Sequence, residues 1–487
     1  MNKILMRQRI ENAQKEIDSK KMIVQNGKMR QHYHFMPQSG WMNDPNGLIF
    51  FNGQYHVFYQ TNPYNGFWDC MHWGHAVSKD LVHWEYLPLA LAPSEEYDDY
   101  QKGGCFSGSA IEHEGKLYVF YTATANHGNG SEQSQCLAIS EDGINFEKYD
   151  GNPLFDAPEG IQPDSFRDPK VWKHENKYYM VVGASRNNRG LALIYESADL
   201  YHWNFLNVLA ESRGEWGFMW ECPDFFALDE KYFLICSPQN MKAQKYEFHN
   251  GNNSVYFVGD YNENTHTFQK EMPKTLDYGL DFYAPQTTEL PDGRRILIAW
   301  MKSWDACVIP EEQKWQGMMT LPRELHYVNG KLYQKPVEEL KNYRKNSCRL
   351  ENQEVSGTVQ FDEVKGRILD LTVEICEGVF DEFCIELAHN QEYTTSYTYY
   401  RKKQIMEVNR TYCGVTRDIV CQRAWKLPEQ KEPLKLRFIM DRQSIELFIN
   451  DGEQVSTTAI CTPMEAEEIV FCCDGTVKIN VEKHELI

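Results

Sequence analysis

The stretch GQYHVFYQ, residues 53–60, decides the fold because four variants of it follow at nearly even intervals along the 487-residue chain. Each copy begins at a turn and continues as a run of β-branched and aromatic residues, which is typical of a β-strand. The variants are GKLYVFYT (115–122), NKYYMVVG (176–183), EKYFLICS (230–237) and RRILIAWM (294–301). A recurrence at about 60 residues indicates a repeated β-sheet unit.

A second pattern, an Asp or Asn four residues before an aromatic residue, recurs in phase with the first. Its copies are Asp80…Trp84, Asp142…Phe146, Asp199…Trp203 and Asn264…Phe268. Five such units over about residues 30–335 predict a five-bladed β-propeller. The alternative is a long β-sandwich with coincidental internal similarity, and the shared phase of the two patterns argues against it.

The flanking segments predict further parts of an all-β protein. The N-terminal segment has a helical pattern with Ile4, Leu5, Ile10 and Ile17 on one side. Near the C-terminus, short alternating strands resume without the 60-residue period, and Asn450-Asp451-Gly452 among them is a hairpin turn signal. We therefore predict an N-terminal helical extension (1–30), a five-bladed β-propeller (31–335), a linker (336–347) and a C-terminal β-sandwich (348–487).

The segment Trp41-Met42-Asn43-Asp44-Pro45-Asn46-Gly47 places a carboxylate among turn-forming residues. Pro45 disfavours a helical conformation at Asp44, so we expect a turn that holds Asp44 at the entrance of a strand. Next comes LIFFNGQYHVFYQ (48–60), which predicts two strands joined at Asn52-Gly53. Taken alone, this segment also fits an ordinary surface turn.

Two later segments favour a catalytic interpretation. Phe166-Arg167-Asp168-Pro169 repeats the Asp-Pro arrangement with an arginine beside it, and Trp220-Glu221-Cys222-Pro223 places a glutamate between an indole and a thiol. Burial there would raise the pKa of the Glu221 carboxyl, as a general acid near neutral pH requires. Hydrolysis of a glycosidic bond needs one carboxylate as nucleophile and one carboxylic acid as proton donor. Because propeller blades point their inner strands at one axial pocket, we expect Asp44, Asp168 and Glu221 to meet there.

At these residues the chain resembles glycoside hydrolase family 32, the β-fructofuranosidases, which include invertases and sucrose-6-phosphate hydrolases. The resemblance covers about residues 30–487 and extends to MHWGHAVS (71–78), CFSGSA (105–110), DFYAPQ (281–286) and LPREL (321–325). It implies a retaining hydrolase that releases terminal β-D-fructofuranosyl units from sucrose, sucrose 6-phosphate or short fructo-oligosaccharides.

The resemblance also implies roles for individual residues. Asp44 would be the nucleophile, Glu221 the acid/base, and Asp168, kept ionised by Arg167, the transition-state stabiliser. The implied substrate-binding residues are Trp41, Met42, Asn43, Gln60, Trp68, Phe106, Ser107, Arg167 and Tyr283. Three alternatives stay open: a fructosyltransferase with the same covalent intermediate, an inverting arabinan-type hydrolase on the same propeller, and a non-catalytic sugar-binding propeller.

Composition limits the partners. A formal net charge of −20 argues against nucleic acid and against an anionic membrane surface, and no apolar run is long enough to span a bilayer. The 14 cysteines include no C-x-x-C pair, which predicts free thiols in the cytoplasm and no metal site. We expect a small sugar as substrate and no cofactor. Oligomeric state stays open.

The identity of the leaving group is the least determined part of the function. The candidates for contacts to glucose, to glucose 6-phosphate or to a longer fructan are His72, Lys302, Arg323 and the segment 302–315. The sequence pattern does not show where any of these residues lies relative to the substrate.

Overall fold

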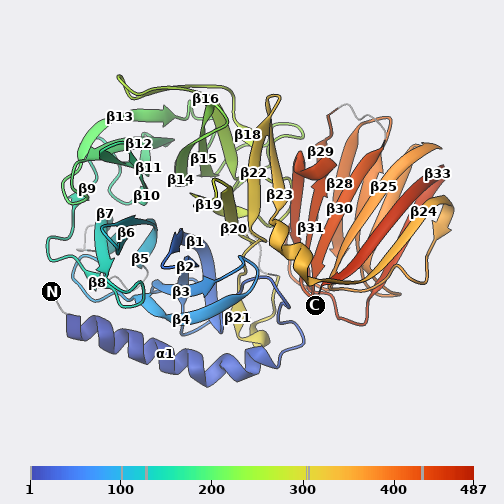
Figure 1. Cartoon of the computed structure of the whole chain (residues 1–487), viewed down its shortest axis with the longest axis horizontal. Coiled ribbons are helices and arrows are strands. Elements are labelled where there is room, and N and C mark those ends of the chain that lie inside the picture. The colour runs from blue at the N-terminus through green and yellow to red at the C-terminus, as the bar shows by residue number, and fades with distance from the viewer. Residues whose placement is uncertain are drawn as a thin grey trace.

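The computed structural model describes residues 3–99, 103–126, 130–302, 304, 308–428 and 433–486. Five small β-sheets form a ring, a larger C-terminal sheet stands beside the ring, and helix α1 (Lys3–Gln25) runs beneath it (Figure 1). The all-β fold, a five-bladed β-propeller followed by a β-sandwich, is therefore confirmed. No helix among the described residues is both long and apolar enough to cross a membrane.

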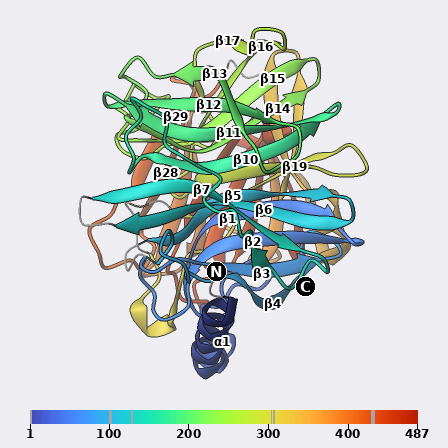
Figure 2. The ribbon, with the colours of Figure 1, turned by 90° about the vertical axis from the view of Figure 1, so that its left-hand side faces the viewer.

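Each blade is an antiparallel sheet whose strands follow one another outward from the axis of the ring (Figures 1 and 2). The innermost strands are β1 (Gly40–Phe51), β5 (Gly104–His113), β10 (Phe166–His174), β14 (Met219–Leu228) and β19 (Tyr283–Glu289). The second strands are β2 (Gln54–Asn62), β6 (Lys116–Asn126), β11 (Lys177–Arg186), β15 (Lys231–Gln239) and β20 (Arg295–Trp300). The repeated sequence motif is thus the second strand of every blade.

The outer half of each blade contains two further strands. The third strands are β3 (His72–Ser78), β7 (Ser131–Ser140), β12 (Arg189–Ser197), β16 (Val255–Asn262) and β22 (Arg323–Val328). The outermost are β4 (Trp84–Leu91), β8 (Glu147–Lys148), β13 (Asn204–Glu211), β17 (Thr267–Lys270) and β23 (Lys331–Pro336), while β9 (Phe155–Asp156) and β18 (Lys274–Thr275) pair with β7 and β16. Strand β21 (Trp315–Gln316), beyond the 3₁₀ turn η1 (Glu311–Gln313), pairs in parallel with β1 and ties the last blade to the first.

The Asp-to-aromatic pattern marks the turn between the third and outermost strands. The carboxylate oxygen of Asp80 accepts hydrogen bonds from the backbone N–H groups of Val82 and His83, and Asp142 and Asp199 do the same in the next two blades. In the fourth blade the acceptor is Asn262, two residues before the predicted Asn264. The side chain therefore replaces backbone partners in a turn, which is why Asp and Asn recur there.

Helix α1 is present as predicted, and Ile10 and Ile17 of the predicted face pack against the propeller, but the buried face also includes residues that the pattern did not name. Met6, Ala13, Ile17 and Val24 are buried, whereas Ile4 is 72% exposed. Ala13 and Ile17 pack against Leu89 of β4. The sequence pattern weighted the large apolar side chains and missed the small residue through which the helix approaches the blade.

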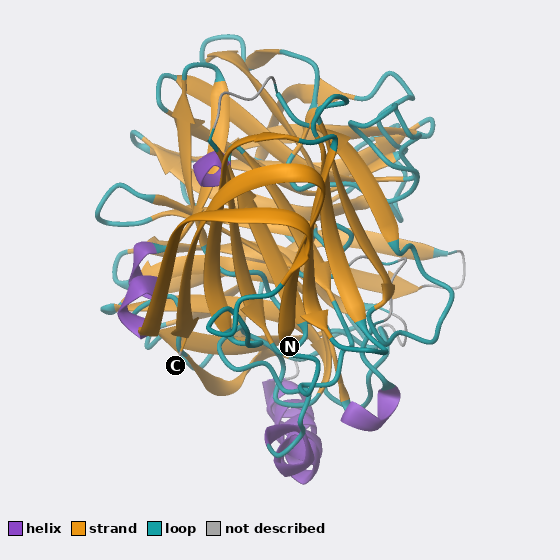
Figure 3. Cartoon of the chain, turned by 90° about the vertical axis from the view of Figure 1, so that its right-hand side faces the viewer, coloured by secondary structure: helices purple, strands orange, loops and turns teal. Residues whose placement is uncertain are grey.

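The C-terminal domain follows the 3₁₀ helix η2 (Glu338–Tyr343). Its strands are β24 (Arg344–Val359), β25 (Leu369–Val379), β26 (Glu382–His389), β27 (Thr394–Tyr400), β28 (Ile405–Tyr412), β29 (Gln422–Lys426), β30 (Leu434–Asp441), β31 (Ser444–Ile449), β32 (Gln454–Ala459) and β33 (Glu468–Leu486). Strand β33 pairs with β26 through its first residues and with β25 through the rest, so one long strand joins the two layers. Figure 3 shows the strands of this domain from the side that faces away from the propeller. The predicted Asn450-Asp451-Gly452 turn, η3 (Asn450–Gly452), connects β31 and β32.

Buried charges join the propeller to the sandwich. Arg323 of the propeller is fully buried and forms ion pairs with Asp277 (3.0 Å) and with Glu446 of the sandwich (2.6 Å). Both ring nitrogens of His34 contact sandwich carboxylates, those of Asp441 (3.0 Å) and Glu446 (2.9 Å). Because removing one member of such a group leaves a buried charge unpaired, these contacts fix the relative position of the two domains.

Candidate active site

All five innermost strands have a break in register at the same level of the ring. The breaks lie between Met42 and Pro45, Cys105 and Gly108, Arg167 and Lys170, Glu221 and Asp224, and Tyr283 and Gln286. A β-bulge bends a strand and redirects the side chains within it. The predicted turn at Asp44 is therefore wrong: Asp44 lies in a bulge inside β1 and not in a loop at its entrance.

Three of these bulges hold their first residue in a left-handed backbone conformation. Asp168 has φ 68°, Cys222 φ 48° and Ala284 φ 51°, and each directly precedes a proline. The neighbouring blade stabilises this strained geometry, because the Asp168 N–H donates to Thr122 Oγ1 (2.9 Å) and the Ala284 N–H donates to Ser237 Oγ (3.1 Å). The backbone is thus fixed where the candidate carboxylates project.

Asp44 is held by a continuous hydrogen-bond network. Ser107 Oγ donates to Asp44 Oδ2 (2.5 Å) and receives a hydrogen bond from Gln60 Nε2 (2.7 Å). Asn43 Nδ2 lies 3.1 Å from both Asp44 Oδ1 and Gln60 Oε1, and Trp41 Nε1 donates to Asn43 Oδ1 (2.7 Å). Four of the predicted substrate-binding residues therefore orient the carboxylate of Asp44.

Glu221 receives four hydrogen bonds. Arg167 donates to Oε1 through Nε (3.0 Å) and Nη2 (2.8 Å), while Gln239 Nε2 (2.8 Å) and the hydroxyl of Tyr283 (2.6 Å) reach Oε2. We expected Arg167 to act chiefly on Asp168, its neighbour in sequence. Successive side chains of a strand point to opposite sides, and the Arg167 guanidinium instead crosses to Glu221 on the next blade.

Cys222 shows that the three carboxylates converge. Its Sγ lies 3.6 Å from Asp44 Oδ2 and 3.6 Å from Asp168 Oδ2, and its backbone N–H donates to Asp168 Oδ2 (2.8 Å). Glu221 is the adjacent residue. Asp44, Asp168 and Glu221 are each less than one-tenth exposed. The structure thus brings together, in one buried pocket, residues from the first, third and fourth blades.

Burial and mutual repulsion raise the pKa values of the two aspartates. Burial raises the pKa of Asp44 to about 6, and the charge of Glu221 adds to this effect while the hydrogen bond from Ser107 opposes it. Burial also raises the pKa of Asp168 to about 7, with Arg167 opposing and Glu221 and Asp44 adding. The sequence-based expectation concerned Glu221 and did not include these increases on the aspartates. Carboxylates this close share protons, so the cluster retains one near neutral pH.

A bell-shaped pH dependence of kcat/KM follows, with an optimum of about pH 6–7. Below pH 6 the pKa of Asp44 leaves this carboxyl protonated and unable to attack. Above about pH 7 the cluster loses the proton that a leaving group needs. Initial rates from pH 4 to pH 9, with residual activity after incubation at each pH as the control, test this expectation. Activity that continues to rise beyond pH 8 would contradict it.

Aromatic side chains surround the carboxylates. Trp41, Tyr283 and Trp300 are buried in one cluster, with Trp68 and Phe106 partly buried against it. Lys302 lies with Nζ 4.1 Å from the centre of the Trp41 ring, and Trp304 stacks on the same indole at 6.1 Å. Aromatic faces and a cation beside an acidic pocket fit a polar ligand with apolar ring faces, such as a sugar.

Three candidates lie elsewhere. Met42 is fully buried in an apolar cluster of the propeller, so its side chain does not line the site. His72 is buried with Nδ1 at 3.0 Å from the Cys70 carbonyl oxygen. Arg323 belongs to the domain interface, and its guanidinium is occupied by Asp277 and Glu446. Within the segment 302–315, residues 303 and 305–307 fall outside the described part of the chain.

Sequence reasoning missed Gln239 and Trp300. Gln239 follows the fourth copy of the repeated strand and pairs with Met219 across the β14–β15 hairpin, which brings it beside Glu221. Trp300 is the last residue of β20, the strand formed by the fifth copy. Their position at the end of the repeated strand, where Gln60 lies in the first blade, was the available signal. Among the described residues, no group of three or more His, Cys, Asp and Glu side chains is arranged to hold a metal ion.

Comparison with known proteins assigns both domains to one family. The model described as "Glycosyl hydrolases family 32 N-terminal domain" matches residues 34–336, and "Glycosyl hydrolases family 32 C terminal" matches residues 339–486. Together the two models span the propeller and the sandwich.

Individual relatives cover most of the chain. A sucrose-6-phosphate hydrolase of Escherichia coli is 38% identical, and a raffinose invertase of the same species is 37% identical, each over 90% of this chain and 90% of the relative. The structure of a mutant GH32 beta-fructofuranosidase of Bombyx mori in complex with sucrose is 32% identical, with a TM-score of 0.85, covering 100% of this chain and 99% of the other.

Proposed function

This chain belongs to glycoside hydrolase family 32, and we propose that it is a β-fructofuranosidase that releases terminal β-D-fructofuranosyl units from sucrose, sucrose 6-phosphate or short fructo-oligosaccharides. The convergence of Asp44, Asp168 and Glu221 around Cys222 is the observation that carries this proposal. Sucrose-6-phosphate hydrolase and invertase activities are named for relatives of similar identity, which supports the substrate class without choosing within it.

We assign the roles by chemistry. Asp44, oriented by Ser107 and Asn43, attacks the anomeric carbon of the fructosyl unit. Glu221 gives its proton to the leaving oxygen, and a covalent fructosyl-enzyme forms through an oxocarbenium-like transition state. Glu221 then activates water, which releases fructose from Asp44 with retained configuration. Asp168 accepts hydrogen bonds from fructose hydroxyls while the ring flattens.

Arg167 and Tyr283 serve Glu221 in this scheme. Their hydrogen bonds stabilise the carboxylate that remains after the proton has left, and Gln239 holds its orientation. Because the donors are fixed before substrate binds, little reorganisation accompanies proton transfer. The aromatic cluster of Trp41, Trp68 and Phe106 supplies the apolar side of the fructose pocket.

Rates on sucrose and on sucrose 6-phosphate test the proposed substrate class. We expect equimolar release of fructose and leaving sugar, with the β-anomer of fructose formed first. Hydrolysis of arabinan, or first formation of the other anomer, would contradict the proposal and favour an inverting hydrolase. Fructosylated sugars as the main products at high sucrose concentration would favour the transferase alternative.

The ratio of the two kcat/KM values identifies the leaving group. A preference of about a hundredfold or more for sucrose 6-phosphate corresponds to about 2.7 kcal/mol and requires a dedicated phosphate contact. Lys302, whose Nζ lies 4.1 Å from the centre of the Trp41 ring, is the cation to test. Lys302→Met should then raise KM for sucrose 6-phosphate alone. We place the enzyme in the cytoplasm, which the free thiols of the described cysteines support.

A further inference from the structure

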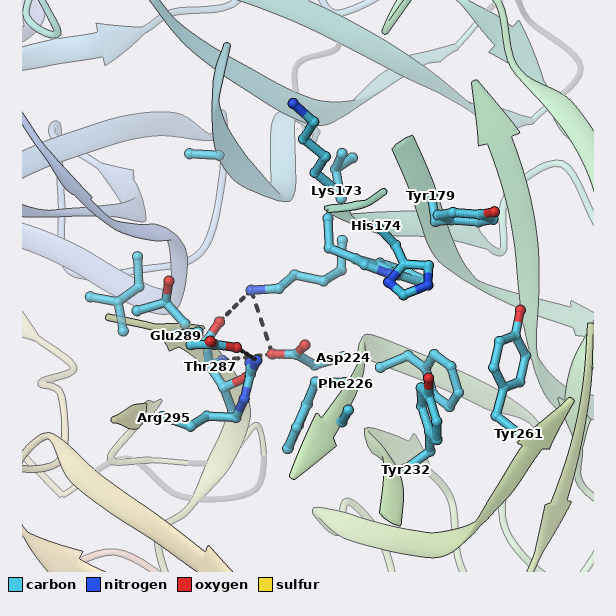
Figure 4. Close-up of a pocket in the computed structure, with 18 of the residues that line it drawn as sticks. Lys173, His174, Tyr179, Asp224, Phe226, Tyr232, Tyr261, Thr287, Glu289 and Arg295 are labelled. Atoms are coloured by element: carbon cyan, nitrogen blue, oxygen red, sulfur yellow. Dashed lines mark hydrogen bonds and ion pairs between the residues drawn. The ribbon is translucent and has the colours of Figure 1, made fainter. Parts of the chain in front are cut away.

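The propeller axis has a second cavity at the end opposite the candidate active site. Asp44, Asp168 and Glu221 lie in the bulged, upstream parts of their strands, whereas the downstream residues Lys170 and Asp224 line a separate cavity of about 330 Å³ (Figure 4). All five innermost strands contribute residues to it. A volume of this size is within the range of small-molecule sites.

An ion pair separates this cavity from the active site. A small void on the axis is lined by Ser107, Asp168 and Cys222 on one side and by Lys170 and Asp224 on the other. Lys170 Nζ lies 3.5 Å from Asp224 Oδ2 and also donates to the carbonyl oxygen of Thr287. The void and the larger cavity therefore meet at these two charged side chains.

Asp224 presents an unsatisfied acceptor to the cavity. Its Oδ2 accepts hydrogen bonds from the Thr287 N–H (2.6 Å) and contacts Lys170, while Oδ1 has no donor among the described residues although the residue is only 1% exposed. Figure 4 shows the second oxygen of Asp224 turned away from Thr287. A buried carboxylate oxygen without a donor is costly, so this position favours a ligand that brings one.

Aromatic rings form the opposite wall. Phe225 and Tyr232 stack with centroids 5.4 Å apart, and Tyr261 packs edge-on against Phe225 at 5.1 Å. In Figure 4, Tyr232 and Tyr261 face the polar side that holds Thr287, Glu289 and Arg295. The cavity thus combines apolar ring faces with hydrogen-bonding groups.

The charged side chains that line the cavity balance, with Lys170, Lys173 and Arg295 against Asp224, Glu263 and Glu289, which favours a neutral ligand. Arg295 is paired with Glu289 (3.0 Å), Lys170 with Asp224, and His174 lies 3.4 Å from Glu263. The unsatisfied group is itself a carboxylate oxygen, which repels anions and accepts from hydroxyl groups. A ligand with several hydroxyl donors and apolar C–H faces can donate hydrogen bonds to the polar side of the cavity and pack against the aromatic side.

We propose that this cavity is a second, non-catalytic site for a neutral mono- or disaccharide. Vicinal hydroxyls of the sugar donate to Asp224 Oδ1, and the C–H face of its ring lies on Tyr232 and Tyr261. The site is separate from Asp44 and Glu221, so sugar binding there does not depend on the hydrolytic function.

Sucrose binding to the Asp44→Asn variant, measured by titration calorimetry, tests this proposal. Ala227 is an exposed residue of β14 at the cavity, so Ala227→Trp in the same background fills the cavity from its rim. We expect the Kd of one binding event to rise at least about tenfold in Ala227→Trp. The Kd of any other sucrose-binding event should change less than about twofold. Val328→Trp, at a 50% exposed position of β22, is the matched control and should leave every event unchanged.

Tyr261→Ala provides a second route if the tryptophan disturbs folding. It removes part of the aromatic wall and should weaken the same event. The proposal is overturned if no sucrose event responds to either variant, or if inorganic phosphate competes for the responsive event. If the hydrolytic proposal alone is wrong, the catalytic event is absent and the Ala227→Trp-sensitive event persists.

Discussion

Replacing Asp44 by asparagine should lower kcat on sucrose by about four orders of magnitude or more. The amide has nearly the shape of the carboxylate and can keep contacts to Ser107 and Asn43, but it cannot form the covalent fructosyl ester. Substrate binding should persist, because the aromatic cluster and Asp168 are untouched. Steady-state kinetics of the purified variant measure the effect directly.

The same variant should be more stable than the parent above pH 6. The folded-state pKa of Asp44 is raised from 3.8 to about 6, so its stabilising contribution is complete below pH 4 and is lost as pH rises through 6. A neutral amide avoids this loss, which is on the order of 3 kcal/mol. Thermal unfolding of both proteins at pH 5 and pH 8 shows whether the stability gained by Asp44→Asn grows with pH.

Asp80→Asn is the matched control. Asp80 lies in the outer turn of the same blade, and an asparagine oxygen can accept the same hydrogen bonds from Val82 and His83. Its activity should stay near that of the parent. An Asp44→Asn enzyme that kept a tenth of the parent activity would remove Asp44 from the nucleophile's role.

Glu221→Ala should separate the two chemical steps. With sucrose, the first step loses its proton donor and should slow by about three orders of magnitude or more. With an activated fructosyl donor, whose leaving group needs no proton, the first step should slow far less. The second step then becomes rate-limiting, because no base activates water.

Azide should restore turnover of the activated donor by Glu221→Ala. This small anion needs no deprotonation and fits the space that the carboxylate vacates, so fructosyl azide should form. Azide should have no such effect on the parent or on Asp44→Asn, which lacks the intermediate. An unchanged rate in azide would argue that Glu221 is not the acid/base.

Much of the fold could be predicted from the sequence because the signals are local and repeated. The second strand of each blade has its own turn and its own β-branched and aromatic residues, and the Asp turn before the outermost strand depends on side-chain hydrogen bonds within a few residues. Convergence of Asp44, Asp168 and Glu221 followed from the radial arrangement of the blades. Those inferences needed no knowledge of packing between distant side chains.

Features set by contacts between blades could not be predicted in this way. The direction of Arg167 depends on a bulge, and that bulge is held by Thr122 of another blade. Met42 turns into the core, and Arg323 is drawn into the interface by Glu446, more than a hundred residues away. No sequence neighbour of these residues indicates their partners.

The pKa values illustrate the same limit. Sequence placed an apolar environment around Glu221, but four hydrogen-bond donors converge on its carboxylate from Arg167, Gln239 and Tyr283. Asp44 and Asp168 lie beside Glu221 with fewer donors, and burial raises the pKa of each. Only the tertiary arrangement determines how far the pKa values of Asp44 and Asp168 are raised.

Mass spectrometry of the acid-quenched Glu221→Ala enzyme during turnover of the activated donor tests the central claim most directly. We predict that the peptide containing Asp44 gains the mass of one fructosyl unit, that the adduct disappears when azide is added, and that Asp44→Asn forms none. Turnover without an adduct, or an adduct on any other residue, would contradict a double displacement at Asp44.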